Sequence, residues 1–264
     1  MIALLLVFVF GTIVGSFLNV CIYRIPKEES IAFPGSHCGA CGKMIRWYDN
    51  VPVASYILLR GRCRECGAKF SIQYPMVEMM SGALFVLFYH YFGITAYGIV
   101  LLTFTLALLT QSVIDFHHKI IPDVITLPGI VIGLVASCFI LQMHGSSVWW
   151  QGLRASVVGM IAGGGSLFLV GVIAEFFLKK EAMGGGDVKL LAMIGAFLGL
   201  AAVAWTIFFG AVIGSLAGVY FMLVKKEEQI PFGPFLGIAA AAYIFLGEKA
   251  IHGYLLFLQS GSLH

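Results

Sequence analysis

The first 23 residues, MIALLLVFVFGTIVGSFLNVCIY (Met1–Tyr23), carry no charged side chain, and the basic residues Arg24 and Lys27 follow them. A helix rises about 1.5 Å per residue, so about 20 apolar residues cross a hydrocarbon core about 30 Å thick. A cleavable signal peptide would carry its basic residues before the apolar run rather than after it. We therefore expect a transmembrane helix with its N-terminus outside and the following loop in the cytoplasm.

The composition of the whole chain is that of a polytopic membrane protein. Of its 264 residues, 60% are hydrophobic and 11% are charged, whereas a soluble domain carries about 25% charged residues. This composition excludes an ordinary cytosolic enzyme, a disordered chain and a nucleic-acid-binding protein. The apolar runs predict an all-α fold of about eight transmembrane helices, at 2–23, 76–92, 94–114, 124–143, 153–178, 188–203, 205–224 and 233–257.

The positions of the basic residues agree with this threading. Four segments would face the cytoplasm: 24–75, 115–123, 179–189 and 225–232. Of the 16 Lys and Arg residues, only Arg154 and Lys249 lie outside these segments. Basic loops set the orientation of a membrane protein, so the net charge of +3 does not require an acidic partner. The predicted organisation is a first helix, a cytoplasmic loop domain and a helical membrane core, at 1–23, 24–75 and 76–264.

The loop domain contains four of the six cysteines, arranged as Cys38-x2-Cys41 and Cys63-x2-Cys66. Two such pairs can supply four thiolates to one tetrahedral zinc ion. Two disulfides are the alternative, but disulfides are rare in the reducing cytoplasm. Because four cysteine ligands close a zinc site to substrate, we expect the zinc to fold the loop and to take no part in chemistry.

Two acidic residues lie at the cytoplasmic ends of predicted helices. Asp115 follows the apolar run 101–114, and Asp187 follows three glycines, Gly184, Gly185 and Gly186. Ionisable groups at the membrane are costly and indicate function. If the two carboxyl groups meet, they share a proton, and one can act as general base toward water while the other acts as general acid. The glycines lack side chains where an extended substrate backbone would approach.

The remaining polar and glycine-rich features have structural interpretations. Gly163–Gly165 lies inside an apolar run, where small residues let helices pack closely. Asp123 follows Pro122 and precedes the fourth predicted helix, which is the position of a helix N-cap. Glu78 and Glu175 lie near helix ends, and the sequence leaves an ion pair, a snorkelling side chain and a ligand contact open for both.

Segments along nearly the whole chain resemble those of the bacterial prepilin peptidases, membrane aspartyl proteases of the GxGD type that are also N-methyltransferases. The matching segments, in the order of that family, are GSFLNV at 15–20, YRIP at 23–26, the four-cysteine loop, YPMVE at 74–78, Asp115-x6-Pro122-Asp123, GGGDVK at 184–189 and PFGPF at 231–235. The resemblance implies that Asp115 and Asp187 are the catalytic pair.

The resemblance also implies two activities at the cytoplasmic face of the bacterial inner membrane. The first is cleavage of type IV prepilins and pseudopilins after the glycine that ends a short basic leader. The second is methylation of the new N-terminal residue by S-adenosylmethionine, in a region that includes Gly61. Some relatives lack the cysteine module, so its presence favours the bifunctional form. The segment from Cys38 to Cys41 lacks the proline often found after the first cysteine of the family.

Two other classes of function account for part of the sequence. An ion- or proton-coupled transporter with a zinc-stabilised regulatory loop explains intramembrane acids, but it predicts acids near the midplane of the bilayer. A scaffold without chemistry explains the cysteine loop but gives no role to the Gly-Gly-Gly-Asp junction. The resemblance favours the peptidase.

Overall fold

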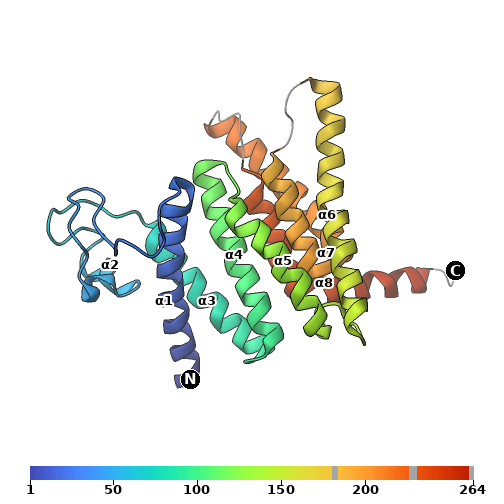
Figure 1. The fold of residues 1–264 in the computed structure, drawn as a ribbon, viewed down its shortest axis with the longest axis horizontal. Helices are drawn as coiled ribbons and strands as arrows, with labels where there is room; N and C mark the ends of the chain where they lie inside the picture. Colours follow the sequence, from blue (N-terminus) through green and yellow to red (C-terminus); the bar gives the residue numbers. More distant parts are fainter. Residues whose placement is uncertain (180–183, 226–230, 262–264) are drawn as a thin grey trace. The chain divides into compact units, whose positions relative to one another are not determined.

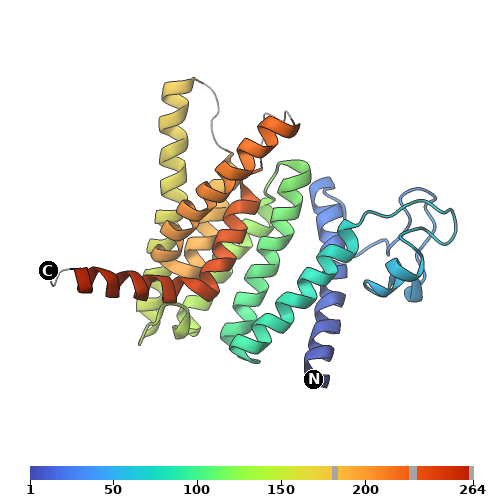
Figure 2. The same ribbon diagram turned by 180° about the vertical axis from the view of Figure 1, so that it is seen from behind.

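Helices joined by loops make up the part of the protein described by the structure, a computed structural model that covers residues 1–179, 184–225 and 231–261 (Figure 1 and Figure 2). Its α-helices are α1 (Ile2–Arg24), α2 (Ala54–Leu58), α3 (Gln73–Phe92), α4 (Ala96–His118), α5 (Asp123–Phe139), α6 (Trp149–Leu178), α7 (Gly185–Tyr220) and α8 (Gly233–Gly261). The predicted all-α fold is confirmed. The chain forms two compact units, unit 1 (Met1–Leu106) and unit 2 (Ala107–His264).

Four segments are long and apolar enough to cross a membrane. They are Ile2–Lys27, Ala96–His118, Trp149–Phe177 and Gly185–Val224, and two shorter apolar helices occur at Asp123–Phe139 and Gly233–Gly247. Large apolar side chains such as Phe168 and Leu169 are exposed on these helices. Such surfaces are stable when they face lipid. The protein is a multi-pass membrane protein.

The boundary between the sixth and seventh predicted helices lies earlier than expected. The sequence predicts it between residues 203 and 205, but the helical backbone of α7 is interrupted at Gly199, which has φ 79° and ψ −176°. Glycine adopts a positive φ without the steric cost that a side chain imposes. The prediction was wrong because the chain is apolar on both sides of the break and no polar loop marks it.

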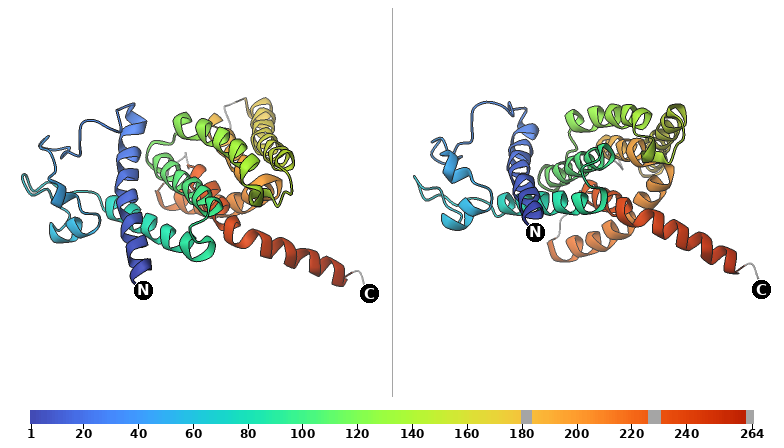
Figure 3. Two further views of the ribbon diagram at one scale, coloured as in Figure 1. Left: turned by 60° about the horizontal axis from the view of Figure 1, so that its bottom comes forward. Right: turned by 90° about the horizontal axis from the view of Figure 1, so that it is seen from below.

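Unit 1 is built on the packing of α1 against α3. A Cβ atom at Gly15 would lie 2.7 Å from the backbone of Glu78, so glycine allows the two helices to approach closely. The Ser81 hydroxyl donates a buried hydrogen bond of 2.8 Å to the carbonyl of Gly11. The loop that leaves α1 and returns to α3 lies beside α1 (Figure 3). The Arg24 side chain fixes the start of this loop through the carbonyls at positions 30, 34 and 35.

In unit 2, α6 and α7 pack through their glycines. A Cβ atom at Gly163 would overlap the backbone carbonyl of Leu191, and one at Gly164 would lie 3.1 Å from Ala192. The packing role predicted for Gly163–Gly165 is therefore confirmed at its first two positions, while Gly165 faces open space. This contact determines how far α7 is shifted along α6. It therefore helps to position Asp187, which lies in the first turn of α7.

Candidate active site and four-cysteine cluster

Asp115 lies near the C-terminal end of α4 and is 5% exposed. Its Oδ2 atom accepts a buried hydrogen bond of 2.9 Å from the backbone N–H of Gly233, the first residue of α8. The first N–H groups of a helix have no partner inside the helix and carry partial positive charge, so a carboxylate is stabilised there. A Cβ atom at position 233 would lie only 2.7 Å from Oδ2. Glycine therefore allows the contact.

Asp187 lies in the first turn of α7 and is partly buried. The carboxyl groups of Asp115 and Asp187 interact electrostatically. Ile121 lies close both to Gly233, which donates to Asp115, and to Gly186, which precedes Asp187: Cβ atoms built at these glycines would lie 3.2 Å and 2.9 Å from its side chain. The structure thus brings together the two acids that the sequence singles out, from positions far apart in the chain.

The three glycines before Asp187 have different surroundings. A Cβ atom at Gly186 would crowd Ile121, so this glycine has a packing role. Among the described residues, a Cβ atom at Gly185 would meet nothing within 4 Å, and one at Gly184 would meet only the Asp187 carboxylate, at 3.6 Å. Within that part of the chain, side chains therefore leave space beside the acid at Gly184 and Gly185, where the sequence predicts the approach of a substrate backbone.

Asp123 is part of an ion pair and not a helix cap. It is the first residue of α5, whose N-cap position is Pro122 and has no side-chain cap, so the predicted N-cap role was wrong. The Nζ atom of Lys189 lies 2.7 Å from both carboxylate oxygens of Asp123. Because both side chains are about half exposed, the pair contributes at most about 1 kcal/mol. It connects the starts of α5 and α7 beside Asp187.

The four cysteines of the loop form one cluster in unit 1. Their sulfur atoms all lie within 4.8 Å of one another, and the cysteines of the described chain are free thiols. The Sγ atoms of Cys38 and Cys66 are 3.8 Å apart. Tetrahedral Zn–S bonds of about 2.3 Å place neighbouring sulfurs about 3.8 Å apart. The donor set, Cys38, Cys41, Cys63 and Cys66, therefore fits a zinc ion.

The two halves of the cluster have the same backbone geometry. The N–H of Gly42 donates to the carbonyl of Cys38 at 2.8 Å, and the N–H of Gly67 donates to that of Cys63 at 2.9 Å. Both glycines have a positive φ, +70° and +71°. Hydrogen bonds from the backbone N–H groups that follow Cys38 lower its pKa to about 6. A lowered pKa favours the thiolate form of Cys38, which is the form that binds metal, whereas the pKa of Cys66 in the same cluster is raised to about 11.

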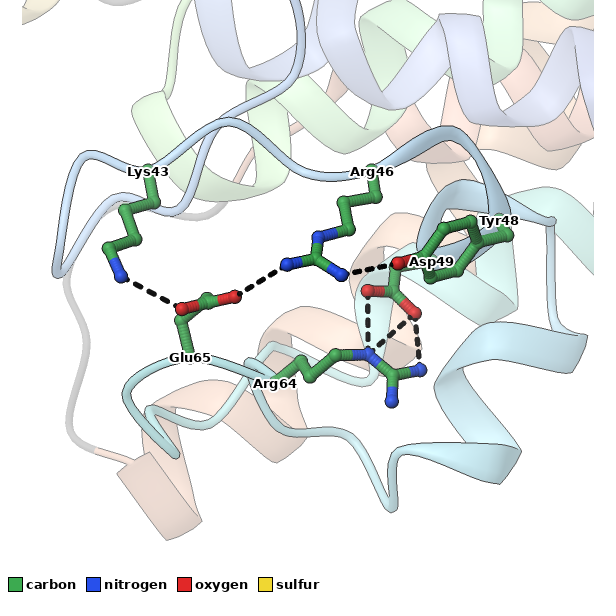
Figure 4. Close-up of polar contacts among 6 residues, drawn as sticks. All are labelled: Lys43, Arg46, Tyr48, Asp49, Arg64 and Glu65. Carbon is green, nitrogen blue, oxygen red and sulfur yellow. Dashed lines mark hydrogen bonds and ion pairs between the residues drawn. The ribbon is translucent and has the colours of Figure 1, made fainter.

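Ion pairs connect the two halves of the cluster (Figure 4). Glu65 pairs with Lys43 at 2.8 Å and with Arg46 at 3.5 Å. Arg64 pairs with Asp49 at 2.6 Å, and its hydrogen bonds lower the pKa of this carboxyl group. These contacts hold the turn of the second cysteine pair, which contains Arg64 and Glu65, against the segment that follows the first pair.

Beside the cluster, unit 1 contains a cavity of about 450 Å³. It is bounded by the C-terminal half of α1, the loop and the first turns of α3, and both Gly61 and Arg62 line it. Gly61 has φ +65°, and a Cβ atom there would lie 2.8 Å from the ring of Tyr56. The structure therefore places Gly61 in a cavity wall where a side chain does not fit.

Sequence reasoning missed two polar contacts that shape these sites. The hydrogen bond from Gly233 to Asp115 joins residues 118 positions apart. Its only signal in the sequence is a glycine between two prolines at the start of a predicted helix. The second contact is the hydrogen bond from the side chain of Asn19 to the carbonyl of Tyr74. Asn19 is 3% exposed and lines the cavity. The signal there is a polar residue within an apolar helix.

Comparisons with known proteins cover both units. Residues 9–92 match the bacterial peptidase A24 N-terminal domain, and residues 99–219 match the type IV leader peptidase family. A protein of Pseudomonas putida is 35% identical over 91% of this chain and 90% of its own length. A protein of Pseudomonas aeruginosa is 33% identical over 94% and 91%, and one of Neisseria gonorrhoeae is 37% identical over 88% and 86%. All three are named prepilin leader peptidase/N-methyltransferase. No solved structure matches the chain.

Proposed function

The chain belongs to the type IV leader peptidase family, and we propose that it removes the basic leader of type IV prepilins and pseudopilins after a glycine and methylates the new N-terminal residue. The observation that supports the proposal is the electrostatic interaction between the carboxyl groups of Asp115 and Asp187 in unit 2. The transporter alternative has no support from the relatives, which are named as peptidases and methyltransferases.

Two neighbouring carboxyl groups favour a state with one shared proton, because ionising both is costly. The Gly233 N–H donates to Asp115, and a hydrogen bond of this kind stabilises the ionised form. We therefore assign Asp115 as the base that takes a proton from water and Asp187 as the acid. The water oxygen bonds to the scissile carbonyl carbon while Asp187 protonates the carbonyl oxygen. Asp115 then passes the proton that it took from water to the amide nitrogen, and the C–N bond breaks. A hydroxyl of the intermediate returns a proton to Asp187, which leaves the carboxyl group of the leader and a free amine.

Space beside the acids supports the approach of an extended peptide. Gly184 and Gly185 have no side chain, so a substrate peptide that approaches Asp187 would meet only their backbone. A glycine at the scissile bond would add no bulk on the substrate side. Gly184, Gly185 and Gly186 are thus proposed to form the substrate approach, with Gly186 also packing against Ile121.

The eight-helix topology in the inner membrane belongs to the same proposal. If α7 crosses the bilayer twice, turning at Gly199, then α1, α3, α4, α5, α6, the two halves of α7 and α8 supply eight crossings. With the N-terminus outside, Asp115, Asp187 and Gly233 all fall at the cytoplasmic ends of their helices. The basic residues of the loop between α1 and α3 favour the same orientation.

The second activity needs a methyl donor and a folded loop. S-adenosylmethionine supplies an electrophilic methyl group to an amine when bound. The cysteines at 38, 41, 63 and 66 would hold one structural zinc ion that folds the loop, because four thiolates leave no open position on the metal. Gly61, which lies in the cavity wall beside them, is proposed to belong to the donor-binding region.

The proposed function is tested by incubating the purified protein with a full-length prepilin, with and without S-adenosylmethionine, and measuring product masses. We expect a shortened pilin in both reactions and the mass of one added methyl group only with the donor. Absence of the shortened product would contradict the peptidase, and a shortened product without added methyl would contradict the methyltransferase.

A further inference from the structure

The cavity in unit 1 has the size of a small-molecule site. Its volume of about 450 Å³ falls within the range of about 300–1,000 Å³ that is usual for ligand pockets. The residues that line it include Asn19 of α1, Arg62 and Lys69 of the loop, and Glu78 of α3. Peptide cleavage, as assigned above to unit 2, uses none of these residues.

Asn19 offers an unused hydrogen-bond acceptor in this cavity. Its side chain is 3% exposed, and its Nδ2 group donates to the carbonyl of Tyr74 at 3.0 Å. The Oδ1 atom has no hydrogen-bond partner in the described part of the chain. A buried acceptor left without a donor costs about 1–3 kcal/mol. A ligand that brings an amino or hydroxyl group to Oδ1 would recover this cost.

Glu78 offers a buried carboxyl group without a counterion. It is 6% exposed, and its carboxylate accepts hydrogen bonds from the N–H of Val53, at 2.7 Å, and from the side chain of Ser16. The ion pairs among the described residues include none with Glu78. Arg24 also lines the cavity, but its guanidinium donates to three backbone carbonyls of the loop. A buried carboxylate of this kind is stabilised by a cationic ligand.

The exposed edge of the cavity carries the opposite charge. Arg62 and Lys69 lie opposite each other across an antiparallel β-bridge, and both are exposed and line the cavity. Within the described residues, neither belongs to an ion pair. Aromatic rings, including those of Tyr56 and Tyr74, complete the walls. The cavity therefore combines an inner acid, an unpaired inner acceptor, aromatic surface and basic groups at its edge.

We propose that this cavity is the binding site for S-adenosylmethionine, with Glu78 facing the sulfonium, Arg62 binding the carboxylate and Asn19 accepting a hydrogen bond from the adenosine. The inference rests on the proposed function, which supplies the need for this donor and places Gly61 in its binding region but assigns no residue to the individual groups of the donor. The orientation follows from charge. The donor's carboxylate and ammonium are bonded to one carbon, so placing the ammonium at Glu78 would bring two carboxylates together, and Glu78 therefore faces the sulfonium.

The same placement gives the cysteine cluster a role in donor binding. Cys38 and Gly61 both line the cavity. A zinc ion bound by the four thiols would fix these walls without contacting the donor. A closed metal site would in this way support methylation although it has no open coordination position.

The test measures binding to the full-length purified protein without any pilin, so that peptide cleavage and methyl transfer play no part. Isothermal titration calorimetry compares S-adenosylmethionine with S-adenosylhomocysteine, which keeps the carboxylate and ammonium but lacks the sulfonium charge. Glu78→Gln keeps an oxygen acceptor for the Val53 N–H and removes the charge. We expect it to weaken S-adenosylmethionine binding by at least about tenfold and to affect S-adenosylhomocysteine much less.

Two further variants complete the pattern. Arg62→Gln should weaken both ligands by a similar, smaller factor, because both carry the carboxylate and Arg62 is exposed. Glu29→Gln removes an exposed acid of the same loop that does not line the cavity, and both affinities should stay as in the wild type. Zinc content and prepilin cleavage check that each variant is folded.

The proposal is overturned if Glu78→Gln binds S-adenosylmethionine within about twofold of the wild type, or if it loses both ligands equally. If Glu78→Gln loses zinc and fails to fold, the comparison of Arg62→Gln with the wild type decides instead. An Arg62→Gln variant that binds both ligands as tightly as the wild type overturns the proposal. A wild-type protein that methylates pilin while Glu78→Gln keeps full affinity refutes this site alone. A wild-type protein that neither binds the donor nor methylates refutes the proposed methyltransferase itself.

Discussion

Gly233→Ala is expected to slow prepilin cleavage through the position of one carboxylate. The added Cβ atom would lie 2.7 Å from Oδ2 of Asp115, whereas ordinary contacts begin at 3.4 Å. The Asp115 carboxylate and the start of α8 must therefore separate by about 0.7 Å, which weakens the hydrogen bond from the Gly233 N–H.

The size of the effect follows from that hydrogen bond. A hydrogen bond to a charged group contributes about 1.5–3 kcal/mol. If the transition state loses this amount, the rate of cleavage falls by about 10- to 150-fold. Methylation of a peptide supplied already cleaved should stay near the wild-type rate, since the proposed donor site lies in unit 1.

The assay measures single-turnover cleavage of a prepilin by the purified variant, and Gly237→Ala is the matched control. Its Cβ atom would lie 2.7 Å from the Ser112 hydroxyl, one turn further along α8, so it perturbs the packing of α8 against α4 without touching an acid. We expect this control to cleave within a few-fold of wild type. The reasoning is refuted if Gly233→Ala cleaves at the wild-type rate, or if Gly237→Ala is slowed as much.

Three further predictions concern the loop of unit 1. Cys63→Ser, or removal of metal by a chelator, should reduce the zinc content and abolish methylation, since the metal folds the loop; metal analysis with a methylation assay checks this. Gly61→Val should reduce methylation at least about tenfold and leave cleavage nearly unchanged, because a Cβ atom would overlap Tyr56 at a positive φ; both rates measured on one preparation check it. Arg64 lowers the pKa of Asp49, so the pair stabilises the loop above pH of about 4 and is lost as the pH falls below it. Thermal unfolding of Asp49→Asn should therefore depend less on pH in that range.

The helical architecture could be predicted from the sequence because it depends on local composition. Apolar runs of suitable length and the positions of basic residues determine where helices lie and how they are oriented. The break at Gly199 could not be predicted in this way, because a positive φ within an apolar segment leaves no compositional signal. Its neighbour is His144, in the connection between α5 and α6, and this contact exists only once the helices have packed.

The candidate sites also combine features that local sequence predicts with features that arise only when the helices pack. The cysteine spacing and the position of Asp115 and Asp187 at helix ends are properties of short segments; the structure gathers the four cysteines in one cluster, and the catalytic pairing of the two acids stays a prediction. The contact between Gly233 and Asp115 is a tertiary one and depends on how α8 meets α4. The pairing of Asp123 with Lys189 has the same origin, and local capping rules gave the wrong role.

The central claim, that Asp115 and Asp187 are the catalytic pair, is tested most directly by measuring prepilin cleavage with Asp115→Asn and Asp187→Asn. Asparagine keeps the shape of each side chain, and at position 115 its carbonyl can still accept from the Gly233 N–H, so both variants should fold and retain zinc. We expect neither variant to yield a shortened pilin, while both still methylate a peptide supplied already cleaved. Cleavage by either folded variant at a rate near that of the wild type would contradict the account.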